Sequence, residues 1–245
     1  MTQRHVALDG AVNFRDLGGY VTGDGHRTRW RVLFRADGLG DLSEKDMDVV
    51  RKLGIRTVVD LRSGHELDQS RFDTVVYPVD FHHIPFIDAL PHADEWDLTP
   101  GLLGAQYKEM LDEATSQIVA ALEVLTTPDA IPAVFHCTAG KDRTGLLAAL
   151  VLSLVGVPEE TVVADYALSG AAMERLRAKL IVKYPDGTDV INGLDEVFSA
   201  KPSNMIDLFV HLREHYGSVT GYAAAIGVTE LVIGQLRALL LEPLP

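Results

Sequence analysis

The 245-residue sequence contains one cysteine, Cys137, so no internal disulfide can form. Its opening, MTQRHVALDG, lacks the apolar segment of a signal peptide. Both features favour a reducing cytoplasm, with export by a route that needs no signal peptide as the alternative. The longest apolar run, residues 146–155 with Ser153 inside it, is about half of the roughly 20 residues that cross a bilayer. The sequence therefore predicts no integral membrane association.

Positive charge is also scarce. The 22 Lys and Arg residues stand against 35 Asp and Glu, which gives a formal net charge of −13. This sign opposes non-specific binding to nucleic acid, so no nucleic-acid partner is expected. The charge is uneven, because residues 4–35 hold six arginines and only three aspartates. That local excess is compatible with a small anionic ligand.

The chain has no internal repeat, no low-complexity tract and no linker rich in Pro, Gly or Ser. Its 47% of apolar residues is typical of a globular protein, and its length fits one large domain. We therefore expect a single domain over residues 1–245.

Strand and helix signals alternate through the first two thirds of the chain. Ser43, followed by acidic residues, begins a helix that ends at Gly54 and leads into a strand at 56–61. The other expected elements are strands at 74–79 and 131–135 and helices at 106–125 and 143–155. This alternation predicts an α/β fold with a central, mostly parallel sheet flanked by helices.

The last third is predicted to be helical. Apolar residues recur at helical spacing in five segments: 159–166, 170–183, 204–216, 219–226 and 229–241. Two long segments with turn residues, 88–101 and 184–203, are predicted to be loops. Loops of that length in a compact domain are often functional lids.

One segment concentrates the reactive side chains. It comprises His136, Cys137, Thr138, Ala139, Gly140, Lys141, Asp142, Arg143, Thr144 and Gly145. It joins the expected strand at 131–135 to the expected helix at 143–155. A loop that leaves the carboxyl end of a strand and enters a helix offers its backbone N–H groups to an anion. We therefore expect residues 138–143 to bind a phosphate group.

Within this loop, Cys137 and Arg143 are the candidates for phosphoryl transfer. The helix dipole and Arg143 would stabilise a Cys137 thiolate, which makes it nucleophilic. The planar guanidinium of Arg143 matches two phosphoryl oxygens. Thr144 is a supporting residue that would donate its hydroxyl to the departing sulfur, and His136 is a second supporting residue. The alternative, Cys137 as a small buried apolar residue, leaves its neighbours unexplained.

The loop resembles the phosphate loop of the cysteine-dependent phosphatases, in which Cys and Arg are separated by five residues. Three further stretches, NFRDLGGY at 13–20, VDLRS at 59–63 and YGS at 216–218, extend the likeness across nearly the whole chain. The sequence resembles the atypical tyrosine phosphatases of bacteria and fungi that also act on phosphoinositides. This resemblance implies one phosphatase domain, no metal cofactor, Cys137 as nucleophile and a helical lid within about residues 165–216.

The proton donor for the leaving oxygen is less obvious, because neither tryptophan is followed by Pro-Asp as in the larger tyrosine phosphatase families. A carboxyl group must supply this proton. In the family that the sequence resembles, the Asp before the Arg has this role, which points to Asp142. Alternatively, Asp142 pairs with Arg143 or caps the helix, and Asp88 or Asp80 is the acid.

The substrate class depends on Lys141. As a second cation in the loop it would favour substrates with several phosphates, whereas in an average loop it would be a solvated charge. The expected substrates are phosphotyrosine, with phosphoserine, phosphothreonine or phosphoinositides in addition. The alternative is a phosphatase for inositol phosphates or phosphoinositides only.

Three further sets of polar residues are candidates for other roles. Arg62 follows the strand at 56–61 and would line the cleft or pair with Glu66 or Asp16. Asp16 itself, next to two glycines, is expected to shape a tight turn. His82 and His83 are neighbours on an extended segment and would point to opposite faces, so they do not suit one metal.

A zinc hydrolase is the rival from another mechanistic class. His211, Glu214 and His215 match the H-x-x-E-H pattern, with both histidines on one helix face. The pattern is short and no third ligand is identified, so a solvated helix face explains it equally well.

Overall fold

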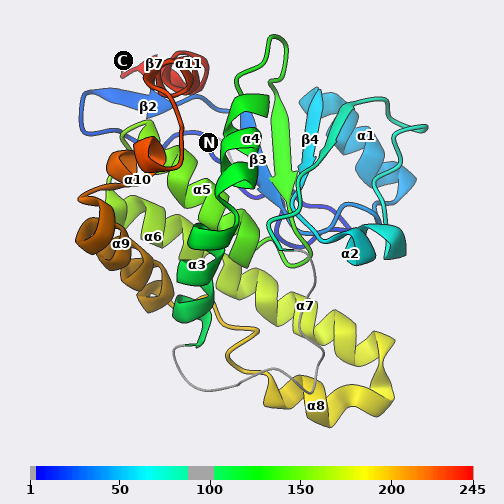
Figure 1. Ribbon diagram of the computed structural model, residues 1–245. Coiled ribbons are helices and arrows are strands. Elements are labelled where there is room, and N and C mark those ends of the chain that lie inside the picture. Colours follow the sequence, from blue (N-terminus) through cyan, green and yellow to red (C-terminus); the bar gives the residue numbers. More distant parts are fainter. Residues whose placement is uncertain (1–3, 88–101, 245) are drawn as a thin grey trace.

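The structure is a computed structural model that describes residues 4–87 and 102–244. Within these residues, five strands form the central sheet in the order β1-β3-β6-β4-β5 (Figure 1). The strands are β1 (Arg15–Asp16), β3 (Leu33–Ala36), β4 (Thr57–Asp60), β5 (Asp80–His83) and β6 (Ala133–His136). β3, β6, β4 and β5 are parallel, and β1 is antiparallel to β3 at the edge. The expected α/β fold with a mostly parallel sheet is confirmed.

The inner strands β3, β6 and β4 are buried on both faces of the sheet, and their successive residues point to opposite sides. Val134 of β6 belongs to the cluster that contains Met47 and Val50 of helix α1 (Glu44–Leu53). Phe135 belongs to the opposite cluster. That second cluster also contains residues of α3 (Leu102–Glu113), α4 (Thr115–Val124) and α5 (Asp142–Leu154). Figure 1 shows α1 and the pair α4 and α5 on opposite sides of the strands.

The first helix follows its sequence signals closely. The Ser43 side chain accepts from the Asp46 N–H, and the Asp46 side chain in turn accepts from the Ser43 N–H. This capping box satisfies donors that the first helical turn leaves free. Gly54 ends the helix at φ 72°, in the left-handed region that glycine adopts without strain.

The C-terminal third is helical, as predicted. Its elements are α6 (Glu159–Ala167), α7 (Ser169–Lys183), the 3-10 turn η1 (Pro185–Gly187), α8 (Thr188–Gly193), α9 (Pro202–Tyr216), α10 (Val219–Ala225) and α11 (Glu230–Leu240). A short antiparallel pair, β2 (His26–Thr28) and β7 (Leu241–Pro243), lies beside α11 (Figure 1). No helix of the described residues is both long and apolar enough to span a membrane.

The predicted strand at 74–79 is wrong. Asp73 Oδ1 accepts the N–H groups of Val75 and Val76, each at 2.9 Å, so the chain turns there. Val75 is 89% exposed and has nothing to pack against. The strand begins only at Asp80, where pairing with β4 outweighs the β-propensity of the residues before it.

Two other boundaries differ from the expectation. The predicted helix at 106–125 is two helices, α3 and α4, because Ala114 leaves helical geometry at φ −92° and ψ 25°. The predicted loop at 184–203 contains η1 and α8. The predicted loop at 88–101 lies outside the described residues.

Candidate active site

The segment with the reactive side chains lies where the sequence places it. β6 ends at His136, and α5 begins at Asp142. Cys137 therefore lies just beyond the carboxyl end of the central strand, and it is 1% exposed. The loop opens toward the amino end of α5, where the positive end of the helix dipole favours an anion.

The carbonyl groups of residues 138–140 are all held from outside the loop. Asn13 Nδ2 donates to the carbonyl oxygens of 139 and 140, both at 3.0 Å. The Gly38 N–H donates to that of 138 at 3.1 Å, and Arg35 Nη2 donates to that of 140 at 2.8 Å. Each carbonyl thus points away from the centre of the loop.

These contacts also set the direction of the loop amides. A trans peptide is planar, so its N–H points opposite to its C=O. The N–H groups of residues 139–141 must therefore face the inside of the loop. In the described parts of the chain, none of these three groups donates to another protein atom. They are free to bind an anion.

Gly140 is required for this shape. Its φ is +66°, and a Cβ there would lie 2.5 Å from the carbonyl oxygen of Ala36. Any other residue would bring both backbone strain and a clash with strand β3. The glycine thus lets the loop lie directly against the end of β3.

Arg143 is held by Glu66 from helix α2 (Gly64–Gln69). Its Nη1 lies 2.6 Å from Glu66 Oε2, and its Nη2 lies 2.8 Å from Glu66 Oε1. The Thr138 hydroxyl donates to the same carboxylate. Burial favours the neutral form of Glu66, yet the hydrogen bonds and charge of Arg143 lower its pKa to about 2. The pair fixes the guanidinium at the edge of the loop.

The sequence analysis missed this role of Glu66 and expected it as a partner of Arg62. Arg62 pairs instead with Asp60, at 2.6 Å from Nη2 to Oδ2, so neither the Glu66 nor the Asp16 carboxylate is its partner. The sequence does contain a capping-box pattern, Ser63-x-x-Glu66, and the structure forms this capping box. It predicts where the helix begins, although it does not predict contact with Arg143.

Asp142 is in the first turn of α5 and points toward helix α3. Its Oδ1 accepts a hydrogen bond of 2.6 Å from the Tyr107 hydroxyl, and Lys141 Nζ lies 3.4 Å away. Within residues 4–87 and 102–244, the Asp142 carboxylate neither pairs with Arg143 nor caps the helix. The two structural alternatives for Asp142 are therefore not formed. Tyr107 has no motif around it, and the sequence analysis did not identify it.

Lys141 is buried rather than solvated. It is 1% exposed, and its Nζ donates to the carbonyl oxygen of Val197 at 2.5 Å. Val197 belongs to the segment 194–201 that leads into α9, within the range in which we expected a helical lid. In the same range, α7 packs over the loop, because Ala172 and Met173 share a cluster with Ala139.

Two supporting residues lie beneath the loop. The Thr144 hydroxyl is buried and has no hydrogen-bond partner among the residues that the structure describes. His136 is fully buried, with Nδ1 3.3 Å from the carbonyl oxygen of Cys137. Burial lowers the pKa of His136 to about 4, against the opposing charge of Asp60. The imidazole is therefore neutral near pH 7.

The NFRDLGG motif supports the loop from behind. Arg15 donates to the Asn13 side chain, and Arg15 and Arg35 both bind the buried carboxylate of Asp165 on α6. Burial would raise the pKa of Asp165, but the two arginines hold it well below its ordinary value. The ionised Asp165 carboxylate thus orders Arg35 directly and Asn13 through Arg15. Asn13 and Arg35 are the side chains that turn the carbonyl groups of residues 139 and 140 outward.

The similarity to known proteins extends over nearly the whole chain. A sequence model described as the tyrosine phosphatase family matches residues 6–242. The chain belongs to the tyrosine phosphatase family. The resemblance seen in the loop and in NFRDLGG is thereby confirmed, and with it the expectation that this family member is a phosphatase.

Individual relatives agree with the family match. PtpB of Mycobacterium tuberculosis, which is named a triple specificity protein phosphatase, is 28% identical over 280 aligned positions that cover 96% of this chain and 98% of PtpB. A tyrosine-protein phosphatase of Nostoc commune is 29% identical over 217 positions, which cover 84% of this chain and 73% of that protein. Among solved structures, P. aeruginosa TpbA matches with a TM-score of 0.38 and 16% identity, covering 86% of this chain and 96% of TpbA.

Asp80, one of the two reserve acids, does not lie at the loop of residues 138–143. Asp80 begins β5, level with Ala133, at the end of the sheet opposite to Cys137, and its carboxylate lies 2.9 Å from His82. Asp88 lies outside the described residues. His83 contacts the carbonyl oxygen of Arg62, so the two adjacent histidines have separate partners. Of the three candidate acids Asp142, Asp80 and Asp88, only Asp142 is placed at the loop within the described residues, whereas the Glu66 carboxylate that also contacts the loop is engaged by Arg143 and Thr138.

Asp16 shapes a turn, as expected. Its carboxylate accepts the N–H groups of Gly18 at 2.7 Å and Arg31 at 2.8 Å. Burial raises the pKa of Asp16, against these hydrogen bonds. Asp16 therefore orders the N-terminal segment and does not approach Arg62.

The zinc pattern on α9 does not form a metal site. The His211 and His215 rings are 4.2 Å apart, and His215 Nδ1 contacts the His211 carbonyl oxygen. Among the described residues, no group of three His, Cys, Asp or Glu side chains is placed to hold a metal ion. The pattern is therefore a feature of the helix surface.

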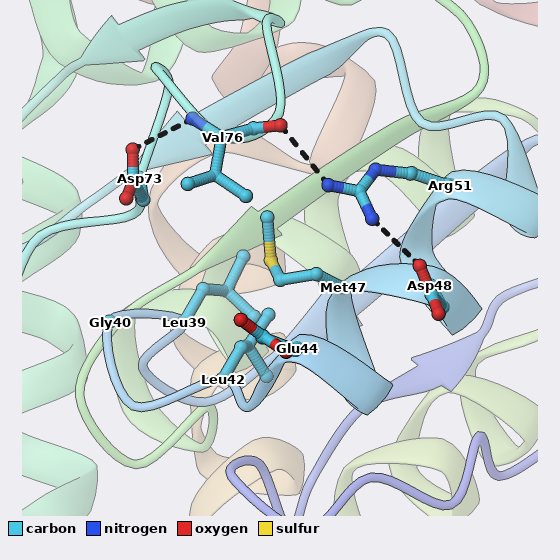
Figure 2. A pocket seen from close by; sticks show the side chains of 9 residues that line it. All are labelled: Leu39, Gly40, Leu42, Glu44, Met47, Asp48, Arg51, Asp73 and Val76. Atoms are coloured by element: carbon cyan, nitrogen blue, oxygen red, sulfur yellow. Dashed lines mark hydrogen bonds and ion pairs between the residues drawn. The ribbon is translucent and has the colours of Figure 1, made fainter.

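A cavity of about 430 Å³ lies away from the loop, between α1 and the turn at Asp73 (Figure 2). Met47 and Leu39 line its floor, and Arg51 bridges Asp48 and the carbonyl oxygen of Val76 at its rim. No residue of the segment 136–145 lines it. It is not part of the candidate active site.

Proposed function

We propose that this tyrosine phosphatase family member hydrolyses phosphomonoesters through a cysteinyl-phosphate intermediate. One observation carries the proposal: the loop carbonyls of residues 138–140 all point outward. Three consecutive amides then remain for one phosphate, beside the Cys137 thiol and the Arg143 guanidinium. Hydrogen-bond donors fixed in advance stabilise charge that grows on a transferring phosphoryl group.

In the first step, the Cys137 thiolate attacks phosphorus and the phosphorus–oxygen ester bond breaks. Asp142 gives its proton to the leaving oxygen, and the alcohol or phenol departs. Arg143 and the loop amides bind the non-bridging phosphoryl oxygens through this change. Glu66 keeps the Arg143 fork at one place, so little reorganisation is needed.

In the second step, water attacks the phosphocysteine. The Asp142 carboxylate takes a proton from that water, the sulfur–phosphorus bond breaks, and inorganic phosphate forms. The Thr144 hydroxyl, buried without another partner among the described residues, donates to the sulfur as it leaves. Cys137 returns as the thiolate, so no external reductant or oxidant is consumed.

Phosphotyrosine is the first substrate class we propose, with phosphoserine, phosphothreonine and phosphoinositides as further substrates. The family assignment and the name of PtpB, triple specificity protein phosphatase, support this range. A phosphoinositide-only enzyme is less well supported, because Lys141 is bound to Val197 and is not presented to a second phosphate.

The test is a phosphatase panel in metal-free buffer, with a phosphotyrosine peptide, a phosphoserine peptide and a soluble phosphoinositide. Cys137→Ser should abolish turnover and retain phosphate-ester binding, because serine keeps the shape of the loop and its hydroxyl is much harder to ionise. Wild-type-like turnover in this variant, or turnover that a chelator removes, would refute the thiol mechanism.

Peroxide provides an independent check of the same thiol. Inorganic phosphate, the product, should protect Cys137 from oxidation, since it occupies the loop and covers the sulfur. The chain has no second cysteine, so intact-mass analysis should show added oxygen and no loss of two hydrogens to an internal disulfide.

A cytoplasmic location and the absence of a metal cofactor and of a nucleic-acid partner stay predictions.

A further inference from the structure

Asp142 shares its hydrogen bond with a tyrosine that is distant in sequence and comes from a different helix. Tyr107 belongs to α3, is fully buried, and its hydroxyl lies 2.6 Å from Asp142 Oδ1. The hydroxyl also lies 2.7 Å from that of Tyr166 on α6. The two rings meet edge to face, with centroids 6.1 Å apart. Three helices therefore converge on one carboxylate.

The direction of these bonds follows from counting protons. A phenol has one proton to donate. When Asp142 is ionised it can only accept, so Tyr107 must donate to Oδ1. Tyr107 then has no proton left for Tyr166, and the Tyr166 hydroxyl must donate to the Tyr107 oxygen. The chain of donors runs from Tyr166 through Tyr107 to Asp142.

Tyr107 stays a donor throughout the pH range of catalysis. Burial and the nearby charge of Asp142 both raise the pKa of Tyr107 well above its ordinary value. The pKa of Tyr166 is raised to about 12, again chiefly by burial. Neither phenol ionises near neutral pH, so this pair fixes the geometry and does not itself supply the catalytic proton.

The bond distinguishes the two carboxyl oxygens of Asp142. Oδ1 is engaged by Tyr107 and lies 3.4 Å from Lys141 Nζ. No residue in the described ranges donates a hydrogen bond to Oδ2, whereas Oδ1 accepts one from Tyr107. A general acid that rotates freely spends part of its time misaligned, and misplacement of a catalytic group is costly in rate. A carboxyl group whose Oδ1 is held by a hydrogen bond presents its Oδ2 in one direction.

We propose that Tyr107 is a positioning residue that holds Asp142 Oδ1, so that Oδ2 carries the proton to the leaving oxygen. This inference rests on the acid role proposed above for Asp142. It assigns a function in the reaction to helix α3, which contributes no residue to the phosphate loop. Lys141 and Arg143 are charged groups near the same carboxylate, and neither forms a hydrogen bond with Tyr107 in the described structure.

The experiment measures kcat/KM for a series of aryl phosphates, from 4-nitrophenyl phosphate to phenyl phosphate. Poor leaving groups need a proton from the acid, whereas good leaving groups need little. Asp142→Asn should lower kcat/KM for phenyl phosphate by about 10² to 10⁴ and much less for 4-nitrophenyl phosphate. Tyr107→Phe should lower it about tenfold for phenyl phosphate, and no more than about twofold for 4-nitrophenyl phosphate.

Tyr166→Phe is the matched control. It removes a buried phenol hydroxyl from the same chain and leaves the Tyr107–Asp142 bond in place, so the leaving-group dependence should steepen less. If Tyr107→Phe does not fold, Tyr107→Met is the second variant, because it removes the same hydroxyl and leaves Tyr166 in place. Thermal unfolding and vanadate inhibition report whether each variant keeps its fold and its phosphate loop.

The double variant decides whether the two residues act together. In Asp142→Asn, adding Tyr107→Phe should leave the leaving-group dependence unchanged, because the proton donor is already lost. If Asp142→Asn steepens the dependence and Tyr107→Phe lowers all esters equally, or none, Tyr107 is only structural and the inference is overturned. If Asp142→Asn itself causes no steepening, the acid assignment fails, and the inference fails with it. The nucleophile remains testable through Cys137→Ser.

Discussion

Glu66 and Arg143 form a two-point ion pair, with 2.6 Å between Nη1 and Oε2 and 2.8 Å between Nη2 and Oε1. The carboxylate comes from α2, after β4, and the guanidinium from α5, after β6. β4 and β6 are neighbours in the sheet, so their carboxyl ends bring the two helices together. Arg143, for which we propose a role in phosphate binding, is thus oriented by a residue 77 positions away in the chain.

Replacing Glu66 tests how much this orientation contributes. Glu66→Gln keeps the size of the side chain and can keep the capping box, but it loses the charge that holds Arg143. A hydrogen bond between charged groups contributes about 1.5 to 3 kcal/mol, so kcat/KM for a phosphotyrosine peptide should fall about tenfold or more. Glu44→Gln, at an exposed position in α1, is the control. Unchanged kcat/KM would mean that the loop alone orients Arg143.

His136 predicts a dependence of stability on pH. The unfolded chain takes up a proton at this residue near pH 6.5, whereas the buried imidazole does so only at about 4. Because the folded-state pKa is depressed, stability is complete above pH 6.5 and is lost as the pH falls toward 4. The free energy of unfolding should drop by about 1.4 kcal/mol for each pH unit in this window.

Urea unfolding at several pH values between 7.5 and 5 measures this slope. This pH range lies above 4.5, the ordinary pKa of Glu66. Because the pKa of Glu66 is lowered in the folded protein, Glu66 adds a further loss of stability only below pH 4.5. His136→Asn should flatten the slope, and His65→Asn, on the exposed side of α2, should not. An equal slope in wild type and His136→Asn would contradict the assignment.

Gly140 tests the shape of the phosphate loop. Gly140→Ala places a Cβ 2.5 Å from the Ala36 carbonyl oxygen at a φ of +66°, so it should destabilise the fold by about 2 kcal/mol or more and abolish turnover. Gly234→Ala, in the interior of α11 with open space around it, should instead stabilise by about 0.5 to 1 kcal/mol. Thermal unfolding and phosphotyrosine hydrolysis measure both effects. Normal turnover in Gly140→Ala would show that this backbone geometry is dispensable.

Lys141 tests the contact between the loop and segment 194–201. Lys141→Met keeps the length of the side chain and removes the bond to the Val197 carbonyl oxygen, so amide hydrogen exchange in 194–201 should accelerate about ten- to a hundredfold. Strand β4 should exchange as before, and Lys52→Met on the exposed face of α1 is the control.

The same variant separates substrate classes. If Lys141 leaves Val197 to bind a second phosphate, Lys141→Met should reduce kcat/KM for a soluble phosphoinositide about ten- to a hundredfold relative to a phosphotyrosine peptide. A ratio that changes by less than about threefold would remove multiply phosphorylated lipids from the proposed substrates.

The sequence by itself determined those features that depend on neighbouring residues. Ser43 and Gly54 set the limits of α1 through local hydrogen bonds and a left-handed turn. The segment from His136 to Gly145 was identifiable because the proposed nucleophile Cys137, Arg143 and Gly140 all lie on one short loop. The strand before it and the apolar helix after it were equally local patterns.

Only the tertiary structure decided which distant residues serve that loop. Glu66, Tyr107 and Asn13 reach it from separate elements, and no spacing in the sequence encodes contacts across 77, 35 or 126 residues. The residues at 74–79 failed as a strand because strand propensity is weak where a side chain finds no packing partner. Local propensity and motif chemistry thus define the loop, whereas the packing of α2, α3 and the N-terminal segment around the sheet determines how the loop and its side chains are held.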